Sequence, residues 1–201
     1  MIVAVAFVCF VMAYGILYSF PVFFVAMFEE LGWSRGMTAA AFSANMFVYG
    51  VSAPLCGALL DRWGPRVVVP LGACVLSIGL AASSQMSSVW QLYLYYGVIA
   101  AVGMNLCGTV PNVAVIQQWF VRRRGTALGF ASAGIGAGML VMAPLMQYLV
   151  STIGWRGAYQ ALAAMTVFTI VPMAALLHRH RPQDMGLQPD GFAAGEQAGM
   201  A

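Results

Sequence analysis

The sequence predicts an all-α membrane protein: six transmembrane helices arranged as two inverted three-helix repeats. Its composition, the spacing of its charges and an internal repeat lead to this fold class. Of the 201 residues, 62% are hydrophobic and only 7% are charged, and the mean hydropathy is +0.84. A soluble domain needs far more polar groups at its surface. The chain is therefore predicted to be an integral membrane protein, with the lipid bilayer as a partner.

The spacing of the charges sets the number of helices, because one span needs about 20 apolar residues. A turn around 82–88 divides the long apolar run between 67 and 121 into two spans. The first run has no basic segment and no cleavage site, so it is a retained helix rather than a signal peptide. The predicted spans are about 2–28, 37–60, 67–83, 89–118, 125–150 and 157–177. Together they form a bundle over 1–181, and the polar, glycine-rich residues 182–201 are expected to be a cytoplasmic linker or disordered tail.

The arginines predict the orientation of the spans. Seven of the nine arginines fall on the side of Asp61, in the segments 62–66, 122–124 and 179–181. Arg35 and Arg156 fall on the other side, with Glu29 and Glu30. The positive-inside rule places the seven in the cytoplasm, together with both termini. We therefore expect a multi-pass plasma-membrane protein. Arginine without lysine, beside abundant Ala and Gly, favours a GC-rich bacterial source and thus the bacterial inner membrane.

An internal repeat relates the two halves of the chain. With a shift of ninety residues, Ala53-Pro54-Leu55 falls on Ala143-Pro144-Leu145, Gly64 on Gly154 and Arg66 on Arg156. Each copy holds three spans, an odd number, so the second copy enters the membrane inverted. Inverted repeats of this kind are typical of secondary transporters.

A charged turn separates the second and third spans. The second span is expected to end at Leu60, and the third to begin at Val67 after a reversal through Gly64-Pro65. Asp61 can accept backbone hydrogen bonds or pair with one of the arginines of its own end, and its simplest role is that of a topological anchor. The residues Gly57, Leu59, Asp61, Arg62, Gly64 and Arg66 resemble the G-x-L-x-D-R-x-G-x-R loop of major facilitator superfamily transporters. The resemblance implies that Asp61, Arg62 and Arg66 form a gating element.

A second segment narrows the resemblance to one branch. The run 119–138 carries the basic loop Arg122-Arg123-Arg124 followed by regularly spaced glycines. It resembles the segment that opens helix 5 in monocarboxylate porters and oxalate:formate antiporters. The Asp-Gly-rich motif of animal monocarboxylate porters is missing from the first span, so the bacterial side of the branch fits better. The resemblance implies the N-terminal half of a carrier that moves a small organic anion by alternating access. Its partner would be a C-terminal six-helix half or a second copy of the chain.

Polar side chains at helical spacing mark candidate substrate-cavity residues. They recur at i, i+4 or i, i+4, i+7 on three spans, so each set lies on one helical face. Interhelical hydrogen bonding explains any single set, whereas three sets together favour a cavity lining. The candidates are Tyr14, Tyr18, Asn45, Tyr49, Asn105, Thr109 and Asn112. Pro21, Pro54, Pro111 and Pro144 are expected to interrupt backbone hydrogen bonds in mid-membrane.

The spans lack the residue patterns of a proton relay, a metal site and an enzyme active site. No Asp, Glu, Lys, Arg or His lies in the middle of a span, so this chain by itself offers no proton relay. The four cysteines lie in apolar runs without C-x-x-C spacing, which predicts neither a disulfide framework nor a metal site. We expect no cofactor, no nucleic-acid partner and no enzymatic activity. The remaining alternative is an inactive fragment or a non-transporting membrane scaffold or sensor.

Overall fold

The computed structural model describes residues 2–120 and 122–177, with side chains as far as Ala174. The all-α prediction is confirmed, since the described residues contain long helices and no strand other than a single bridge residue at Phe120. The expected tail at 182–201, together with Arg179 and Arg181, lies outside the described residues. The helices are α1 (Ile2–Leu31), α2 (Arg35–Trp63), α3 (Pro65–Ser83), α4 (Val89–Leu92), the π-helix η1 (Tyr93–Ala100), α5 (Ala101–Cys107), α6 (Thr109–Trp119) and α7 (Arg124–Leu177).

Two of the six predicted spans lie in α7. Gly154, at φ 73° and ψ 165°, is not helical and divides α7 into two antiparallel arms. The fourth span is a composite of α4, η1, α5 and α6, which together cover Val89–Trp119. At a rise of about 1.5 Å per residue, the 30 residues of α1 extend about 45 Å, more than the hydrocarbon core of a bilayer.

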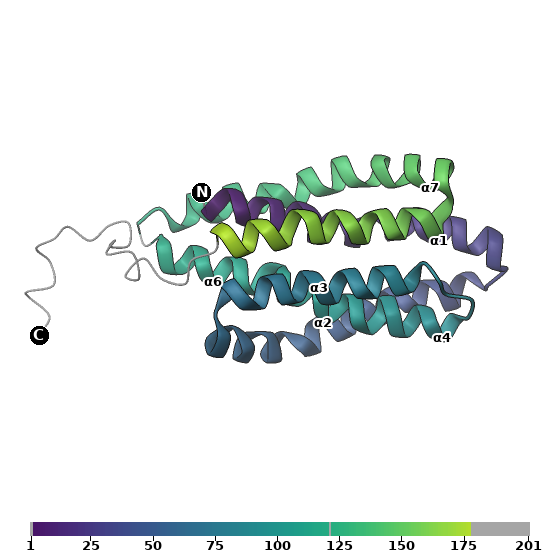
Figure 1. Cartoon of the computed structure of the whole chain (residues 1–201), viewed down its shortest axis with the longest axis horizontal. Coiled ribbons are helices and arrows are strands. Elements are labelled where there is room, and N and C mark those ends of the chain that lie inside the picture. The colour runs from purple at the N-terminus through teal and green to yellow at the C-terminus, as the bar shows by residue number, and fades with distance from the viewer. Residues whose placement is uncertain (1, 121, 178–201) are drawn as a thin grey trace, which may run out of the picture.

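The helices run up and down along one axis, so their connections gather at the two ends of the bundle (Figure 1). The turn at Gly64, the start of α1 and the start of α7 lie at one end. The turns after α1, after α3 and at Gly154 lie at the other end. Asp61, Arg66 and Arg124 therefore share an end, while Glu30 and Arg156 share the opposite one. The fold thus gathers the charges as the predicted topology requires.

The connection between α2 and α3 is shorter than expected. Helix α2 continues to Trp63 and α3 begins at Pro65, so Asp61 and Arg62 belong to the last turn of α2. Gly64 alone is non-helical, with φ 72°, a conformation that costs glycine little. Pro65 then starts α3 at a position where its missing N–H is harmless. The expectation that α2 ends at Leu60 is wrong because one left-handed glycine suffices to reverse the chain.

The inverted repeat is visible in matching backbone geometry. Gly64 and Gly154, ninety residues apart, have φ/ψ of 72°/164° and 73°/165°. The same shift relates two helix crossings. A Cβ on Gly15 of α1 would lie 2.4 Å from Cγ of Met142 in α7. The equivalent pair is Asn105 of α5 and Ser52 of α2, joined by a 2.9 Å hydrogen bond. The crossing of α1 with α7 is close because Gly15 has no side chain, whereas the equivalent crossing of α5 with α2 is joined by the hydrogen bond of Asn105.

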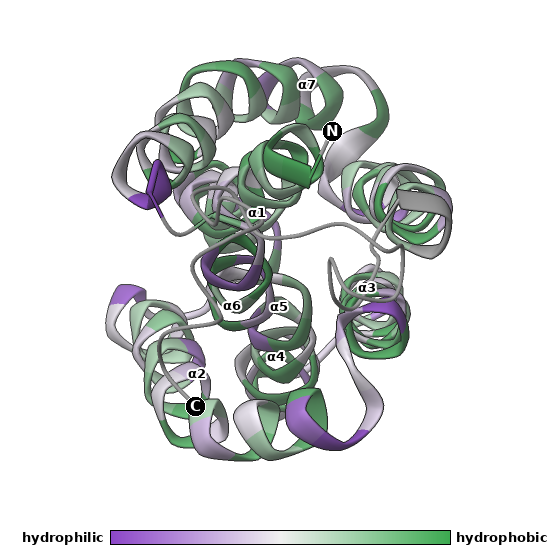
Figure 2. Cartoon of the chain, turned by 90° about the vertical axis from the view of Figure 1, so that its left-hand side faces the viewer, coloured by the Kyte–Doolittle hydropathy of each residue, from purple (hydrophilic) through white to green (hydrophobic). Residues whose placement is uncertain are grey.

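Close backbone contacts and apolar outer faces complete the bundle. A Cβ at Gly138 would lie 2.5 Å from the Val11 carbonyl oxygen, and one at Gly103 would lie 2.3 Å from the Leu76 nitrogen. Small residues at such crossings let membrane helices approach closely. Seen along the bundle, the outer helix faces are predominantly hydrophobic (Figure 2), and Phe168 and Leu140 are each 78% exposed. These surfaces suit acyl chains rather than water.

Candidate functional site

Three hydroxyl groups from three spans meet inside the bundle. The Tyr14 hydroxyl of α1 lies 2.7 Å from Oγ1 of Thr109, the first residue of α6. The Tyr49 hydroxyl of α2 lies 3.3 Å from the same oxygen. We call Tyr14, Tyr49 and Thr109 the hydroxyl cluster. Three hydroxyls carry three hydrogens, and these two bonds use two of them. The third hydrogen is available to another acceptor, and all three residues are only half-buried.

A break in the fourth span places Thr109 at this point. Gly108, with φ −89° and ψ −128°, separates α5 from α6. A Cβ there would lie 2.4 Å from the Met104 carbonyl oxygen, so the position accepts only glycine without a shift. Pro111 has no N–H to bind the Cys107 carbonyl four residues earlier. The Asn112 amide instead donates to the Cys107 and Gly108 carbonyls, at 2.9 and 2.6 Å. The interruption expected at Pro111 therefore appears three residues earlier, at the glycine.

The three asparagines among the predicted cavity residues are fully buried and bond to neighbouring backbone. Asn105 donates to the Tyr49 carbonyl at 2.7 Å, which fixes α2 beside the break. Asn45 donates to the Tyr96 carbonyl in η1, also at 2.7 Å. Asn112 caps the break itself. These contacts are interhelical and local packing bonds, which leaves the half-buried hydroxyl cluster as the accessible polar group.

Tyr18, the remaining predicted cavity residue, lies one turn from the cluster on α1. Its ring stacks on that of Tyr14, with centroids 6.4 Å apart and an interplanar angle of 21°. The side chain is 42% exposed. Tyr18 therefore extends the face of the hydroxyl cluster along α1 toward the end that carries Glu30.

The predicted gating residues lie together at the opposite end from Glu30. Asp61, Arg62 and Arg66 are exposed, and Gly57 has open space beside it. Arg122, Arg123 and Arg124 are exposed at the same end, just before and at the start of α7. Within the described part of the chain, Asp61 forms no ion pair with any of these arginines. The pairing of Asp61 with these arginines, which the sequence left open, is not formed among the described residues.

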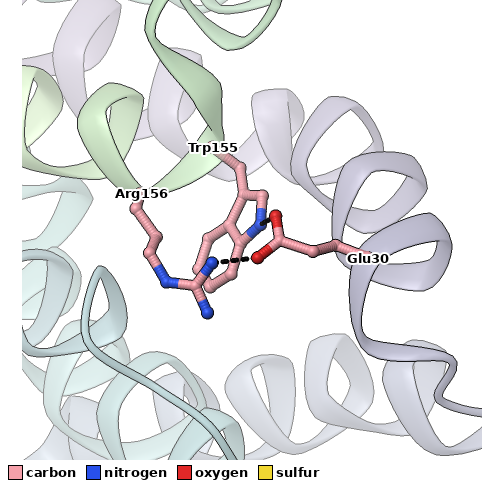
Figure 3. A network of polar contacts seen from close by, with 3 residues as sticks. All are labelled: Glu30, Trp155 and Arg156. Atoms are coloured by element: carbon pink, nitrogen blue, oxygen red, sulfur yellow. Dashed lines mark hydrogen bonds and ion pairs between the residues drawn. The ribbon is translucent and has the colours of Figure 1, made fainter.

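A polar clamp that the sequence did not predict joins α1 to the second arm of α7 (Figure 3). Trp155 Nε1 donates to one carboxylate oxygen of Glu30 at 2.6 Å, and Arg156 donates to the other. The guanidinium also stacks over the Trp155 ring, 4.1 Å from its centroid. Because α1 is longer than the hydrocarbon core of a bilayer, Glu30, exposed in its last turn, is expected at the membrane surface. There the hydrogen bond from Arg156 holds the pKa of the Glu30 carboxyl below the ordinary value. The only signal in the sequence was that both charges belong to the same end.

Comparison with known proteins supplies the family. Residues 5–195 match the family profile described as Major Facilitator Superfamily. The chain is 36% identical over 176 residues to monocarboxylate transporter 11 of Mus musculus, covering 88% of this chain and 39% of that protein. It is 34% identical over 192 residues to monocarboxylate transporter 13 of Bos taurus, covering 94% and 43%. It is 33% identical over 193 residues to monocarboxylate transporter 4 of Rattus norvegicus, covering 94% and 41%.

The match extends along nearly all of this chain but along only 39–43% of these relatives. It agrees with the apolar helices and with the Gly57–Arg66 and Trp119–Gly138 motifs in the sequence. An all-α membrane bundle, two inverted repeats and a profile match over most of the chain lead to one assignment. This chain is a multi-pass membrane protein that belongs to the major facilitator superfamily.

Proposed function

We propose that the chain is the N-terminal half of a secondary transporter that moves a small organic anion by alternating access. The observation that carries this proposal is the hydroxyl cluster at the helix break, in a chain of the major facilitator superfamily. Discontinuous helices near the bilayer midplane commonly form transporter binding sites. The names of the relatives, monocarboxylate transporters, support a monocarboxylate or an oxalate- or formate-like anion as the substrate class.

The anion is recognised here by hydrogen bonding rather than by a fixed positive charge. The described spans hold no basic side chain in mid-membrane, so a carboxylate oxygen would accept the one free hydrogen of the hydroxyl cluster. Asn105 and Asn112 hold Tyr49 and the helix break in position. Tyr18 extends the proposed cavity through its stacked ring. Asn45 supports the cavity from behind, because its amide holds η1 beside α2 through the Tyr96 carbonyl.

The charged end supplies the proposed gate. Asp61 stands exposed in the last turn of α2, next to the Gly64 reversal. A carboxylate in this place can pair with a cation of the other half when the cytoplasmic side closes, and separate when it opens. Arg62, Arg66 and the Arg122–Arg124 loop would hold this end in the cytoplasm and shape the contact. Gly57, which has open space beside it, leaves room for the approach, and Gly64 makes the reversal that ends α2.

A second bundle is needed to complete the carrier. The chain spans 39–43% of its relatives, and α2 has a smaller buried share than α1 or α3. We propose that a C-terminal six-helix half covers this face. A second copy of the chain is the alternative partner.

The test is uptake of radiolabelled formate, lactate, pyruvate and oxalate into proteoliposomes. One preparation holds the chain alone, and a second holds it with a C-terminal six-helix half of the same family. We expect saturable uptake of at least one anion in one preparation, and its loss in the Asp61→Asn variant. If neither preparation takes up any of the anions, the chain is a fragment or a membrane scaffold and the proposal is wrong.

A further inference from the structure

Two phenol groups inside the bundle have no hydrogen-bond partner among the described residues. Tyr96 lies in the π-helix η1 of the fourth span, and Tyr159 lies in the second arm of α7. Each side chain is only 1% exposed, and its hydroxyl is closed off from the surface. A buried hydroxyl without a partner costs free energy, so buried polar groups in folded proteins are nearly always bonded to protein atoms or to ordered water.

The two phenols are neighbours along one helix, α1. The Tyr96 ring stacks on Phe20, with centroids 4.6 Å apart, and the Tyr159 ring stacks on Phe23, with centroids 4.0 Å apart. Residues three apart on a helix lie side by side on its surface. Both tyrosines belong to one buried core cluster, and Tyr159 is close enough to act electrostatically on Tyr96. We call Tyr96 and Tyr159 the phenol pair.

The other buried polar side chains near the phenol pair bond to the backbone instead. Ser77 of α3 donates to a backbone carbonyl of α7 at 3.0 Å, and Thr166 donates to a carbonyl of its own helix at 2.8 Å. The Asn45 amide donates to the backbone carbonyl of Tyr96 and not to its phenol. Neither bulk solvent nor a lipid headgroup reaches side chains that are this deeply buried. Bound water is the partner that remains.

We propose that the phenol pair binds ordered water, which bridges η1 in the fourth span to the second arm of α7. Folded proteins hold about one buried water per 27 residues, and each makes about three hydrogen bonds to groups that would otherwise be unsatisfied. One water can therefore serve both hydroxyls. The water site shares no residue with the hydroxyl cluster and does not depend on the transported anion.

The sign of a stability change tests the water site. Tyr96→Phe and Tyr159→Phe each remove one hydroxyl and keep the ring. Each variant leaves the bound water and the other phenol short of a bond, so we expect the Tm in detergent to fall by at least about 2 °C. The double variant should lose less than the sum of the two single losses, because both partners of the water are then gone. Tyr148→Phe is the matched control, since Tyr148 is 65% exposed and its Tm should not change.

An unchanged or higher Tm in the two single variants would overturn the proposal. It would mean that the hydroxyls have no partner, because removing an unsatisfied buried hydroxyl does not destabilise a protein.

Pulsed radiolysis detects the water directly, because hydroxyl radicals formed from a bound water oxidise the side chains beside it. We expect oxidation of Tyr96 and Tyr159 in the full chain above that of Phe10, an aromatic side chain that is also 1% exposed. Oxidation at both positions should fall to the Phe10 level in the double variant. Oxidation of the phenol pair at the Phe10 level in the unmodified chain would overturn the water site, even if the single variants are less stable, because the phenols would then bond to each other.

Discussion

At the scale of single residues, the site depends on the backbone around Gly108. Thr109 reaches both tyrosine hydroxyls because the helix is interrupted one residue before it. The interruption frees the backbone carbonyls of Cys107 and Gly108. The side-chain amide of Asn112 donates hydrogen bonds to both, so neither carbonyl is left without a partner in an apolar environment. Glycine, proline and asparagine thus act together to turn one hydroxyl toward two others.

Gly108→Ala should disturb this arrangement. The new Cβ would lie 2.4 Å from the Met104 carbonyl oxygen, so the backbone must shift. We expect a loss of about 1–3 kcal/mol in the free energy of unfolding, measured by thermal denaturation in detergent, together with weaker anion uptake. Gly129→Ala is the control, because Gly129 has open space beside it and alanine favours helix. Equal stability of the two variants would contradict the proposed role of Gly108.

At the scale of elements, the sequence predicts which segments cross the membrane but not how they pack. Gaps between charges locate the spans, and the shift of ninety residues correctly pairs Gly64 with Gly154. The clamp of Glu30 with Arg156 joins segments that are far apart in the sequence, so no local pattern indicated it. No sequence pattern indicated the π-helix at Tyr93–Ala100 either. Helical spacing placed Asn105 and Thr109 in one set of candidate cavity residues. In the structure, Asn105 hydrogen-bonds to the Tyr49 backbone, whereas Thr109 belongs to the hydroxyl cluster.

The clamp predicts a pH dependence of stability. Because Arg156 lowers the pKa of Glu30, the ion pair contributes fully above the ordinary pKa of a glutamate and is lost as the pH falls through the lowered value. Both side chains are about half exposed, at 43% and 50%, so the contribution should stay below about 1 kcal/mol. Glu30→Gln should reduce the thermal stability at pH 7 and abolish this acid-dependent loss.

Glu29→Gln is the matched control for the clamp, since Glu29 is the neighbouring exposed carboxylate and forms no ion pair within the described residues. Thermal unfolding of both variants would be followed from pH 7 down to pH 3. Superimposable curves for the two variants would mean that the clamp does not stabilise the bundle.

At the scale of the whole molecule, the two ends of the bundle carry different charges, and this difference predicts the orientation. Arg62, Arg66 and the 122–124 loop lie at one end, and only Glu29, Glu30, Arg35 and Arg156 are charged at the other among the described residues. By the positive-inside rule, this bias predicts that the Asp61 end faces the cytoplasm. We therefore expect the proposed gate to face the cell interior.

Labelling with a membrane-impermeant maleimide measures this orientation. Arg66→Cys should react only in inside-out vesicles, and Ser151→Cys, near the Gly154 end, only in right-side-out vesicles. The native cysteines should stay silent. Cys9, Cys56 and Cys107 are buried, and Cys74, although exposed, lies in the middle of the apolar helix α3, where a membrane-impermeant reagent does not reach. The reverse pattern would place Asp61 outside and invalidate the cytoplasmic gate.

The central claim is that the hydroxyl cluster binds the transported anion, and the KM of Thr109→Val tests it most directly. Valine keeps the shape of threonine but removes the oxygen shared by Tyr14 and Tyr49. A hydrogen bond to a charged group is worth about 1.5–3 kcal/mol, so we predict that the KM for the transported anion rises at least about tenfold. Thr109→Ser, which retains the hydroxyl, should keep a KM near the wild-type value. Unchanged uptake kinetics in Thr109→Val would contradict the claim.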